Sequence, residues 1–498
     1  MQQPNFVFIM TDTQGANIIG AYGHPELETP NIDNLARNGV QFDRAYTSCP
    51  LCTPARGGIF SGMYSNMAGP WANELSFRDN VKSVGQRFQD SGYRTAYVGK
   101  WHLDGHDYFG TGICPDGWED AFWYDARCYL EELGVEKARL WRSGLNSLEQ
   151  LKAHDIQPEF TMAHRVSNRA IGFLEQNDGS KPFLLVVSYD EPHHPFTCPP
   201  EYAERFEEYT YPVGPAAYDD LENKPTHHTE WANGHRQQVE SHLESGDRWR
   251  DPLYFGCNSF VDHEIGRVID AVHAYSPENT YIIFTSDHGA MMGAHQLHDK
   301  GPAMYEEITH IPFIIEAPKG MGGGVTNSTL VSHVDLLPTM LDLAGLEVPP
   351  VMAGQSLVPL LNGQEDPGKS VMIEFNRFGA VHEYMGGLQP IRCIVSDHYK
   401  LVINLLYTDE LYNLAEDPAE LNNLIEHPGY TDIRNALHDR LLDRMHEILD
   451  TLRGPCWERR PWRDTRRFPW AGGTRPLHAD GYAPEVLDYQ TGSPDKHV

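Results

Sequence analysis

Short apolar runs alternate with longer helical patterns along the first 370 residues. The runs are continuous and do not alternate with polar residues, which favours strands buried on both faces, as in a parallel sheet covered by helices. The predicted strands are Phe6–Met10, Thr95–Val98, Phe183–Tyr189, Tyr281–Thr285 and Pro312–Glu316. The predicted helices are Asn31–Asn38, Val81–Ser91, Met162–Gln176, Leu253–Tyr275 and Val334–Ala344. This order predicts an α/β fold with a large, doubly wound, mostly parallel sheet.

Polar residues follow several of these strands directly. Asp12, Lys100, Asp190 and Asp287 each come just after a predicted strand. In doubly wound folds, ligands bind outside the carboxyl ends of the strands. The pattern therefore predicts a functional site at that edge of the sheet.

The pattern changes after about residue 370. Short strands of a meander are expected at Val371–Asn376, Ile391–Val395 and Lys400–Leu405, and one amphipathic helix at Tyr430–Leu452. We predict a catalytic domain over 1–370 and a smaller C-terminal α+β domain over 371–498. The aperiodic stretch Arg453–Val498 is expected to wrap the protein or to form a contact in a homo-oligomer.

Charge and composition exclude some partners. The chain has 39 basic and 70 acidic side chains, a formal net charge of −31, which repels nucleic acid and anionic membranes. No apolar run approaches the ~18 residues of a membrane span. We therefore expect no nucleic-acid or membrane partner, and an anionic substrate would need a local cluster of cations.

The cysteines and the N-terminal segment bear on the compartment. Apart from Cys49 and Cys52, which have C-x-x-C spacing, the eight cysteines are scattered along the chain, which favours a reducing environment over a disulfide framework. The first residues show no basic segment followed by an apolar one, as a signal peptide would have. We expect a cytoplasmic protein, or a periplasmic or secreted one if a signal peptide has been lost.

The segment Cys52-Thr53-Pro54-Ala55-Arg56, followed by Ser61-Gly62, is the strongest chemical signal. Proline is tolerated early in a helix, so Cys52 is expected at a helix N-terminus. Backbone N–H groups and the helix dipole there favour a bound sulfate or phosphate. Arg56, one turn on, could hold the anion.

This segment closely resembles the C-x-P-x-R motif of the sulfatase family with its trailing S/T-G. Further segments match the family in order along the chain: Asn5 to Asp12, Gly99-Lys100-Trp101-His102, Pro192-His193-His194-Pro195, Ser286-Asp287-His288-Gly289, Lys300-Gly301, Ser332 to Thr339, and Glu410 to Leu414. The resemblance implies an alkaline-phosphatase-like fold. It also implies that a formylglycine-generating enzyme oxidises Cys52 to formylglycine (3-oxoalanine), whose hydrate attacks a sulfate ester.

The resemblance implies a site for one divalent metal ion. Its ligands would be Asp12, Asp287, His288 and the modified Cys52; carboxylate oxygens suit Ca²⁺, Mg²⁺ or Mn²⁺, and the imidazole shifts the balance towards Mn²⁺. Most sulfatases carry tandem aspartates after the first strand, whereas this chain has Asp12-Thr13-Gln14. In this respect it is similar to the choline sulfatase and phosphonate monoester hydrolase branches. Gln14 is expected to complete the ligand set through its amide oxygen.

The remaining catalytic roles also follow from the resemblance. Arg56, Lys100, His193 and Lys300 would surround the ester oxygens and stabilise developing charge. His102 would take a proton from the second hydroxyl of the hydrate, and His193 or Lys300 would protonate the departing alcohol. The expected substrate contacts are Asn73, His106 and His194.

We therefore predict hydrolysis of sulfate esters, on a sugar or sugar acid. The carbohydrate preference rests on polar and aromatic residues near the motifs, such as Trp101 and Trp118. One alternative is a phosphonate monoester or phosphodiester hydrolase using the same site. Another is a non-catalytic anion- or metal-binding relative, which the filled catalytic positions disfavour. A cysteine phosphatase would need its arginine further downstream, and no G-x-S-x-G elbow is present.

Overall fold

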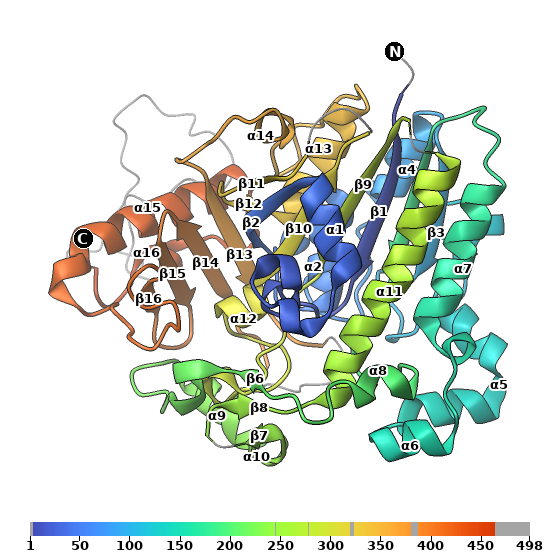
Figure 1. Cartoon of the computed structure of the whole chain (residues 1–498). Helices are drawn as coiled ribbons and strands as arrows, with labels where there is room; N and C mark the ends of the chain where they lie inside the picture. The colour runs from blue at the N-terminus through green and yellow to red at the C-terminus, as the bar shows by residue number, and fades with distance from the viewer. Residues whose placement is uncertain (1–2, 245, 277, 319–322, 380–386, 464–498) are drawn as a thin grey trace.

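A nine-stranded mixed sheet forms the centre of the molecule (Figure 1). The computed structural model describes residues 3–244, 246–276, 278–318, 323–379 and 387–463. The strand order is β11-β2-β10-β9-β1-β5-β3-β4, and β12 pairs with β2. The strands are β1 (Asn5–Thr11), β2 (Val40–Tyr46), β3 (Arg94–Gly99), β4 (Trp123–Tyr124), β5 (Phe183–Ser188), β9 (Thr280–Ser286), β10 (His310–Glu316), β11 (Val325–Asn327) and β12 (Val331–Ser332).

All five predicted strands are confirmed, and the sheet is mostly parallel. Strand β10 is the exception, since it runs antiparallel to both β9 and β2. Strand β2 was not predicted, because Gln41, Asp43 and Arg44 interrupt its apolar residues and leave no continuous run. These three side chains are only half-buried, as expected for a strand towards the margin of the sheet.

Helices cover both faces of the sheet. Successive strand residues point to opposite faces, so Val7 and Ile9 pack under one helical layer and Phe6 and Phe8 under the other. The first layer contains α1 (Pro30–Asn38), α5 (Ala126–Ser143), α6 (Leu148–Ala153), α7 (Met162–Glu175) and α11 (Pro252–Tyr275). The second contains α2 (Cys52–Ser61), α4 (Val84–Asp90), α13 (Leu336–Leu343) and α14 (Val358–Leu361). The doubly wound α/β architecture is therefore confirmed.

A smaller domain with a four-stranded antiparallel sheet follows in the chain. Its elements are β13 (Ser370–Phe375), β14 (Ile391–Ser396), β15 (Tyr399–Asn404), β16 (Glu410–Asn413) and helix α15 (Thr431–Glu447). One face of this sheet packs on Cys49 and Leu51, directly before α2. The small domain thus supports the segment that leads into Cys52. The boundary at residue 370 stays a prediction, and most of the predicted tail, residues 464–498, lies outside the described residues.

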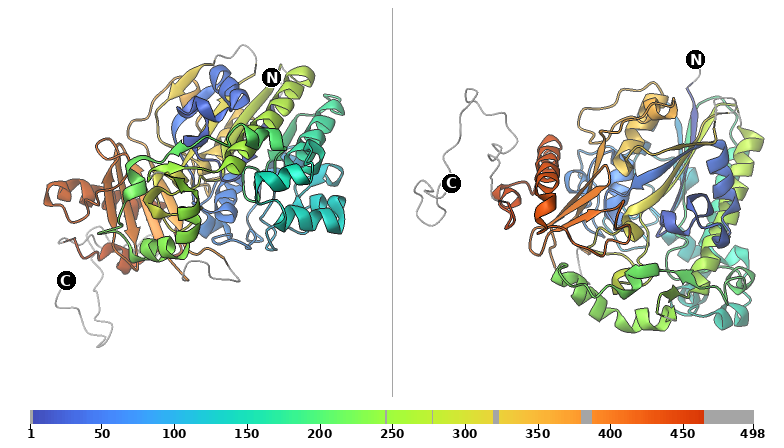
Figure 2. Two further views of the ribbon diagram at one scale, coloured as in Figure 1. Left: turned by 60° about the horizontal axis from the view of Figure 1, so that its bottom comes forward. Right: turned by 60° about the vertical axis from the view of Figure 1, so that its left-hand side comes forward.

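A largely helical insertion covers the carboxyl ends of the central strands. Figure 2 (left) brings this green segment forward. It contains β6 (Tyr211–Pro212), α9 (Thr226–Gly234), α10 (Arg236–His242), β7 (Leu243–Glu244) and β8 (Arg248–Trp249). The remaining short helices are α3 (Ser65–Ala68), α8 (Pro200–Glu204), α12 (Glu306–Thr309) and α16 (Pro455–Glu458). Among the helices of the described residues, none combines the length and apolar character needed to cross a bilayer.

Candidate active site

Cys52 is the first residue of helix α2, as the position of Pro54 predicted. Every residue of this helix is buried. The Asn73 side-chain oxygen accepts a hydrogen bond from the Thr53 backbone N–H at 3.1 Å. Asn73, predicted as a substrate contact, thus uses its amide oxygen to satisfy a donor at the start of the helix. Pro54 has no N–H, and the Ala55 N–H donates to the Leu51 carbonyl at 2.9 Å, so these positions of the first turn leave no free donor.

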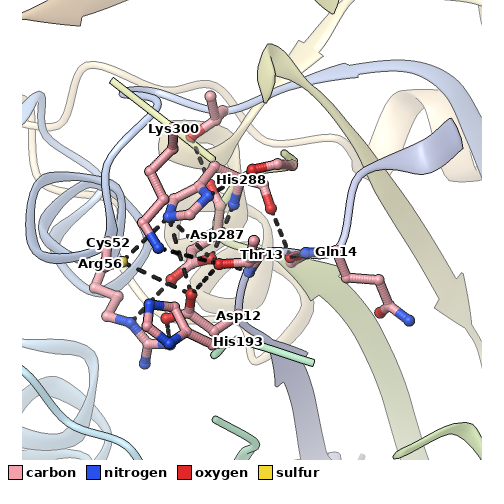
Figure 3. Close-up of polar contacts among 12 residues, drawn as sticks. Asp12, Thr13, Gln14, Cys52, Arg56, His193, Asp287, His288 and Lys300 are labelled. Carbon is pink, nitrogen blue, oxygen red and sulfur yellow. Dashed lines mark hydrogen bonds and ion pairs between the residues drawn. The ribbon is translucent and has the colours of Figure 1, made fainter. Parts of the chain in front are cut away.

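Four potential metal-ligand atoms converge beside Cys52 (Figure 3). They belong to Asp12, Cys52, Asp287 and His288, which are all buried, and they lie within 4.8 Å of one another. Cys52 Sγ is 3.2 Å from His288 Nε2 and 3.7 Å from Asp12 Oδ1. Asp12 follows β1, while Asp287 and His288 follow the adjacent parallel strand β9. The pairing of these two strands therefore joins ligands that are far apart in the sequence.

The donor chemistry of this cluster fits a divalent cation. His288 Nδ1 donates to the Gly289 carbonyl at 2.9 Å, which leaves the Nε2 lone pair facing the cluster. Burial and the charge of Lys300 lower the pKa of His288 to about 4, so its ring is neutral. Burial and the neighbouring Asp12 raise the pKa of Asp287 to about 8. A cation between the two carboxylates would relieve their repulsion.

Gln14 does not join this cluster, in contrast to its predicted role as a ligand. Its Oε1 accepts from Thr11 Oγ1 at 2.7 Å, and its Nε2 donates to Asn258 Oδ1 at 2.6 Å. Figure 3 shows its side chain pointing away from the ligand atoms. The amide is held by a residue of α11, so the fold gives Gln14 a structural role.

Arg56 binds the two carboxylates. Its Nε lies 3.1 Å from Asp287 Oδ2, one terminal nitrogen lies 3.1 Å from Asp12 Oδ2, and the other donates to the Lys100 carbonyl at 2.7 Å. The arginine and both aspartate side chains are 0% exposed. All three of its nitrogens are engaged, so in this structure Arg56 positions the carboxylates and leaves the anion to other groups.

Two lysines supply the remaining positive charge. Lys100 Nζ lies 2.6 Å from Asp12 Oδ2 and 3.2 Å from Asp190 Oδ1. Lys300 Nζ lies 3.3 Å from Asp299 Oδ1 and 3.4 Å from Thr13 Oγ1. Burial opposes charge on Asp12, but Lys100 and Arg56 outweigh it and hold the pKa of Asp12 well below its usual value. The site thus has the local cations that an anionic substrate requires.

The two histidines predicted to transfer protons are neutral in this environment. Burial, Lys100 and Arg56 hold the pKa of His102 well below its usual value, so its ring can accept a proton. His102 has a positive φ of 58°, which turns its backbone sharply after β3. Burial, Lys300 and Lys100 lower the pKa of His193 in the same way.

Tyr108 is a site residue that the sequence did not reveal. Its hydroxyl donates to Asp190 and lies 3.0 Å from His193 Nδ1. Its ring centroid is 4.0 Å from Lys100 Nζ. Tyr108 comes from an irregular loop outside every matched motif, so no sequence signal marked it. It links the loop that carries His193 to Lys100.

The two other predicted substrate contacts lie further out. The His106 side chain is 56% exposed and pairs with Asp107 at 3.4 Å, so the structure does not bring it to the cluster. The His194 side chain is exposed, with its ring 5.4 Å from that of Phe196. His194 and Thr13 line the same cavity, beside the cluster.

Glu191 anchors the loop that carries Asp190 and His193, and it gives a pH-dependent prediction. Its Oε1 accepts from the Ala163 N–H in α7 at 2.9 Å, and burial and Asp190 raise its pKa from 4.5 to about 8. The folded state therefore binds more protons than the unfolded state between these values, so this contribution to stability is complete below pH 4.5 and is lost as pH rises to about 8.

We expect Glu191→Gln to remove this loss, by as much as about 1.4 kcal/mol per pH unit within that window. The measurement is the free energy of unfolding in urea at several pH values for both proteins. Glu278→Gln changes an exposed glutamate and should leave the pH profile unchanged. Parallel profiles for wild type and Glu191→Gln would contradict the prediction.

The chain matches two protein-family models. Residues 4–346 match the model described as Sulfatase, and residues 293–447 match N-sulphoglucosamine sulphohydrolase, C-terminal. The sulfatase YidJ of Escherichia coli strain K12 is 50% identical over 100% of this chain and 98% of its own length. The N-acetylglucosamine-6-O-sulfatase of Bacteroides thetaiotaomicron is 27% identical over 90% of this chain and 87% of its own.

Solved structures share the architecture at low identity. A protein in complex with its substrate D-glucosamine-2-N,6-O-disulfate has a TM-score of 0.73 and 23% identity, over 91% of this chain and 99% of that chain. The phosphonate monoester hydrolase of Agrobacterium radiobacter has a TM-score of 0.69 and 23% identity, over 89% of this chain and 95% of that chain. At these identities, the likeness concerns the fold.

Proposed function

Because this chain belongs to the sulfatase family, it is a sulfuric ester hydrolase, and we propose that it removes sulfate from a sugar through a modified Cys52. The fold is the alkaline-phosphatase-like one that the sequence implied. The observation that carries the proposal is the position of Cys52 Sγ. It lies at a buried helix N-terminus, 3.2 Å from His288 Nε2 and beside two carboxylates.

The electrostatics support modification of Cys52 over direct thiolate chemistry. Burial and Asp12 raise the pKa of the Cys52 thiol to about 12, so the unmodified side chain is a neutral, weak nucleophile. Oxidation by a formylglycine-generating enzyme would supply an aldehyde hydrate, one hydroxyl of which attacks sulfur while the other later loses its proton. The helix N-terminus and Lys300 would then stabilise negative charge near residue 52.

The surrounding side chains divide the remaining tasks. His102, neutral and buried, would accept the proton of the second hydroxyl. Lys100 and Lys300 would face the ester oxygens, and Lys300, or His193 after it has gained a proton, would protonate the departing alcohol. Arg56 would act through the aspartates that it holds.

The cluster at Cys52 would also hold one divalent ion. Asp12, Asp287, His288 and the modified residue 52 offer hard oxygens and one imidazole, which suit Ca²⁺ or Mn²⁺, with Mg²⁺ as a further candidate. When bound, the ion would supply Lewis-acid stabilisation of negative charge. Thr13, where most sulfatases have a second aspartate, donates to Asp12 Oδ1 at 2.7 Å and leaves this ligand set with one carboxylate fewer.

Metal removal should lower both activity and stability. We expect a chelator to decrease the melting temperature and the sulfatase rate, and re-addition of Ca²⁺ or Mn²⁺ to restore both. Asp287→Ala should lose the ion almost entirely, while Asp299→Ala, outside the ligand set, should retain it. Elemental analysis of the purified proteins measures the metal content directly. An active wild-type protein without stoichiometric metal would contradict the ligand set.

The substrate class is tested by comparing esters that share one leaving group. The relatives named as sugar sulfatases support a sulfated sugar, and Lys100 and Lys300 supply the positive charge that a sulfate needs. We expect turnover of aryl sulfate, weaker turnover of aryl phosphonate, and the highest kcat/KM for a sulfated saccharide. A phosphonate preference above about tenfold, or about 1.4 kcal/mol in transition-state stabilisation, together with no turnover of sulfated sugars, would favour the phosphonate alternative.

The cysteines support a cytoplasmic location as part of this proposal. None of the eight, which all lie among the described residues, forms a disulfide, and Cys456 is exposed. Free thiols persist in reducing compartments.

We also propose a homo-oligomer formed through the C-terminal tail. Sedimentation of the full chain and of a chain ending at residue 463 would test this proposal.

A further inference from the structure

A cavity of about 360 Å³ opens directly beside the catalytic cluster. Thr13 and Asp299 are among the residues that line it. Thr13 Oγ1 donates to Asp12 Oδ1 at 2.7 Å, and Lys300 Nζ lies 3.4 Å from the same hydroxyl. A sulfate ester bound near Lys300 could therefore direct its alcohol part into this cavity.

The walls of the cavity are mostly apolar and aromatic. They include Phe196, Tyr254 and Met292, and Trp249, whose ring stacks on His242 at 4.8 Å and 11°. Two side-chain amides, Asn146 and Gln238, also line the cavity. Apolar and aromatic surfaces with a few polar groups suit a sugar ring, which has an apolar face and hydroxyls at its edge.

The charges of the lining are unusual for a site that adjoins an anion-binding centre. The acidic Asp251 and Asp299 line the cavity, and no lysine or arginine does so among the described residues. Lys300 holds the pKa of Asp299 below its usual value despite burial, so this carboxylate is ionised. Burial lowers the pKa of His298, which keeps this imidazole neutral. Lys300 already pairs with Asp299 at 3.3 Å, so a second anionic group in the cavity would face Asp251 and Asp299 without a lysine or arginine of its own among the described lining residues.

The volume of the cavity limits the size of the ligand that it can hold. Ligand pockets in proteins typically measure about 300–1,000 Å³, so this cavity is near the lower end. The insertion that contains α10 and β8 contributes Gln238, His242 and Trp249 to the walls. This size suits a single sugar unit better than a polymer.

We propose that this cavity binds the alcohol part of the substrate and selects one sugar ring that carries no anionic group other than the sulfate to be removed. The proposal rests on the proposed function and deepens it. Neutral and amino sugars would fit, whereas uronic acids and polysulfated sugars would be disfavoured. The repulsion between an extra anionic group on the sugar and the carboxylates of the cavity would contribute to specificity as much as the favourable contacts do.

Binding to Cys52→Ala tests this selection without turnover. Calorimetry would compare galactose and N-acetylglucosamine monosulfated at each hydroxyl with the corresponding disulfated sugars and with a sulfated uronic acid. We expect the best monosulfated sugar to bind at least about tenfold more tightly than any disulfated or uronic ligand. Equal or tighter binding of the more highly charged ligands, or no binding of any monosulfated sugar, would overturn the proposal.

A charge inserted at the cavity provides a second test. Gln238→Lys places a cation on an exposed position of α10 that lines the cavity, and should shift the preference in kcat/KM towards disulfated sugars. Gln237→Lys adds the same charge to an exposed neighbour outside the lining and should leave the preference unchanged. If both variants behave like wild type, the cavity does not receive the sugar.

Turnover of an aryl sulfate by the wild-type protein distinguishes the proposed sulfatase activity from the substrate selection proposed for the cavity. Aryl sulfate turnover combined with a preference for polysulfated sugars would remove only the selection proposed for the cavity. Absence of turnover of every sulfate ester by protein that carries formylglycine at residue 52 would instead remove the proposed function, and calorimetry would still report on the cavity.

Discussion

Cys52→Ala should lower kcat for sulfate esters on the order of 10⁶-fold, the scale seen when a hydrolase loses its nucleophile. The physical reason is that alanine offers no group to oxidise, while the neighbouring Asp12, His288 and Lys300 remain in place. The melting temperature should change little, because a small side chain is shortened by one buried atom. Steady-state kinetics with an aryl sulfate measure the loss.

Mass spectrometry of the peptide that contains Cys52 provides the companion measurement. In active wild-type protein this peptide should be about 18 Da lighter than its unmodified form, since the thiol is replaced by an aldehyde. Cys456→Ala makes the same substitution at an exposed cysteine and should keep full activity. Activity of Cys52→Ala near the wild-type level would exclude residue 52 as the nucleophile.

Arg56→Gln should destabilise the protein by about 3–5 kcal/mol, the usual cost of breaking a buried ion pair. Arg56, Asp12 and Asp287 are fully buried, and the guanidinium lies 3.1 Å from an oxygen of each carboxylate. Without it, the two carboxylates repel each other in a low-dielectric interior. The free energy of unfolding in urea, measured with a chelator present, should show the full loss.

A divalent ion should restore part of this stability, because it would neutralise the same two carboxylates. The loss caused by Arg56→Gln should therefore be smaller with Ca²⁺ or Mn²⁺ than with chelator. Arg37→Gln, at an exposed position of α1, should change stability by less than about 0.5 kcal/mol in either condition. A loss at Arg56 that is small, or that does not depend on metal, would contradict this account of the cluster.

The sequence by itself determined most of the central architecture. The strands β1, β3, β5 and β9 and the helices between them could be predicted because a strand buried on both faces needs a continuous apolar run, and that requirement is local. The start of α2 at Cys52 is local too, since it depends on where Pro54 can be accommodated. The polar residues that directly follow these strands then indicated where the site would form.

Other features depended on residues distant in the sequence. Gln14 follows Asp12 by two positions, yet Asn258 of α11 turns its amide away from the ligand atoms. Arg56 could have faced an anion, but Asp12 and Asp287 engage it. Tyr108 carries no motif, and it enters the site only because its loop packs against Lys100 and the loop that carries His193.

The tertiary structure alone decided the form of the substrate cavity. Its walls come from Thr13, Asn146, Phe196, Trp249 and Asp299, which no local pattern connects. A strand or a helix start depends on a few consecutive residues, so its signal is present in the sequence. The orientation of a polar side chain and the charge of a cavity depend instead on which distant groups fold against it, because buried donors, acceptors and charges must find partners wherever the fold provides them.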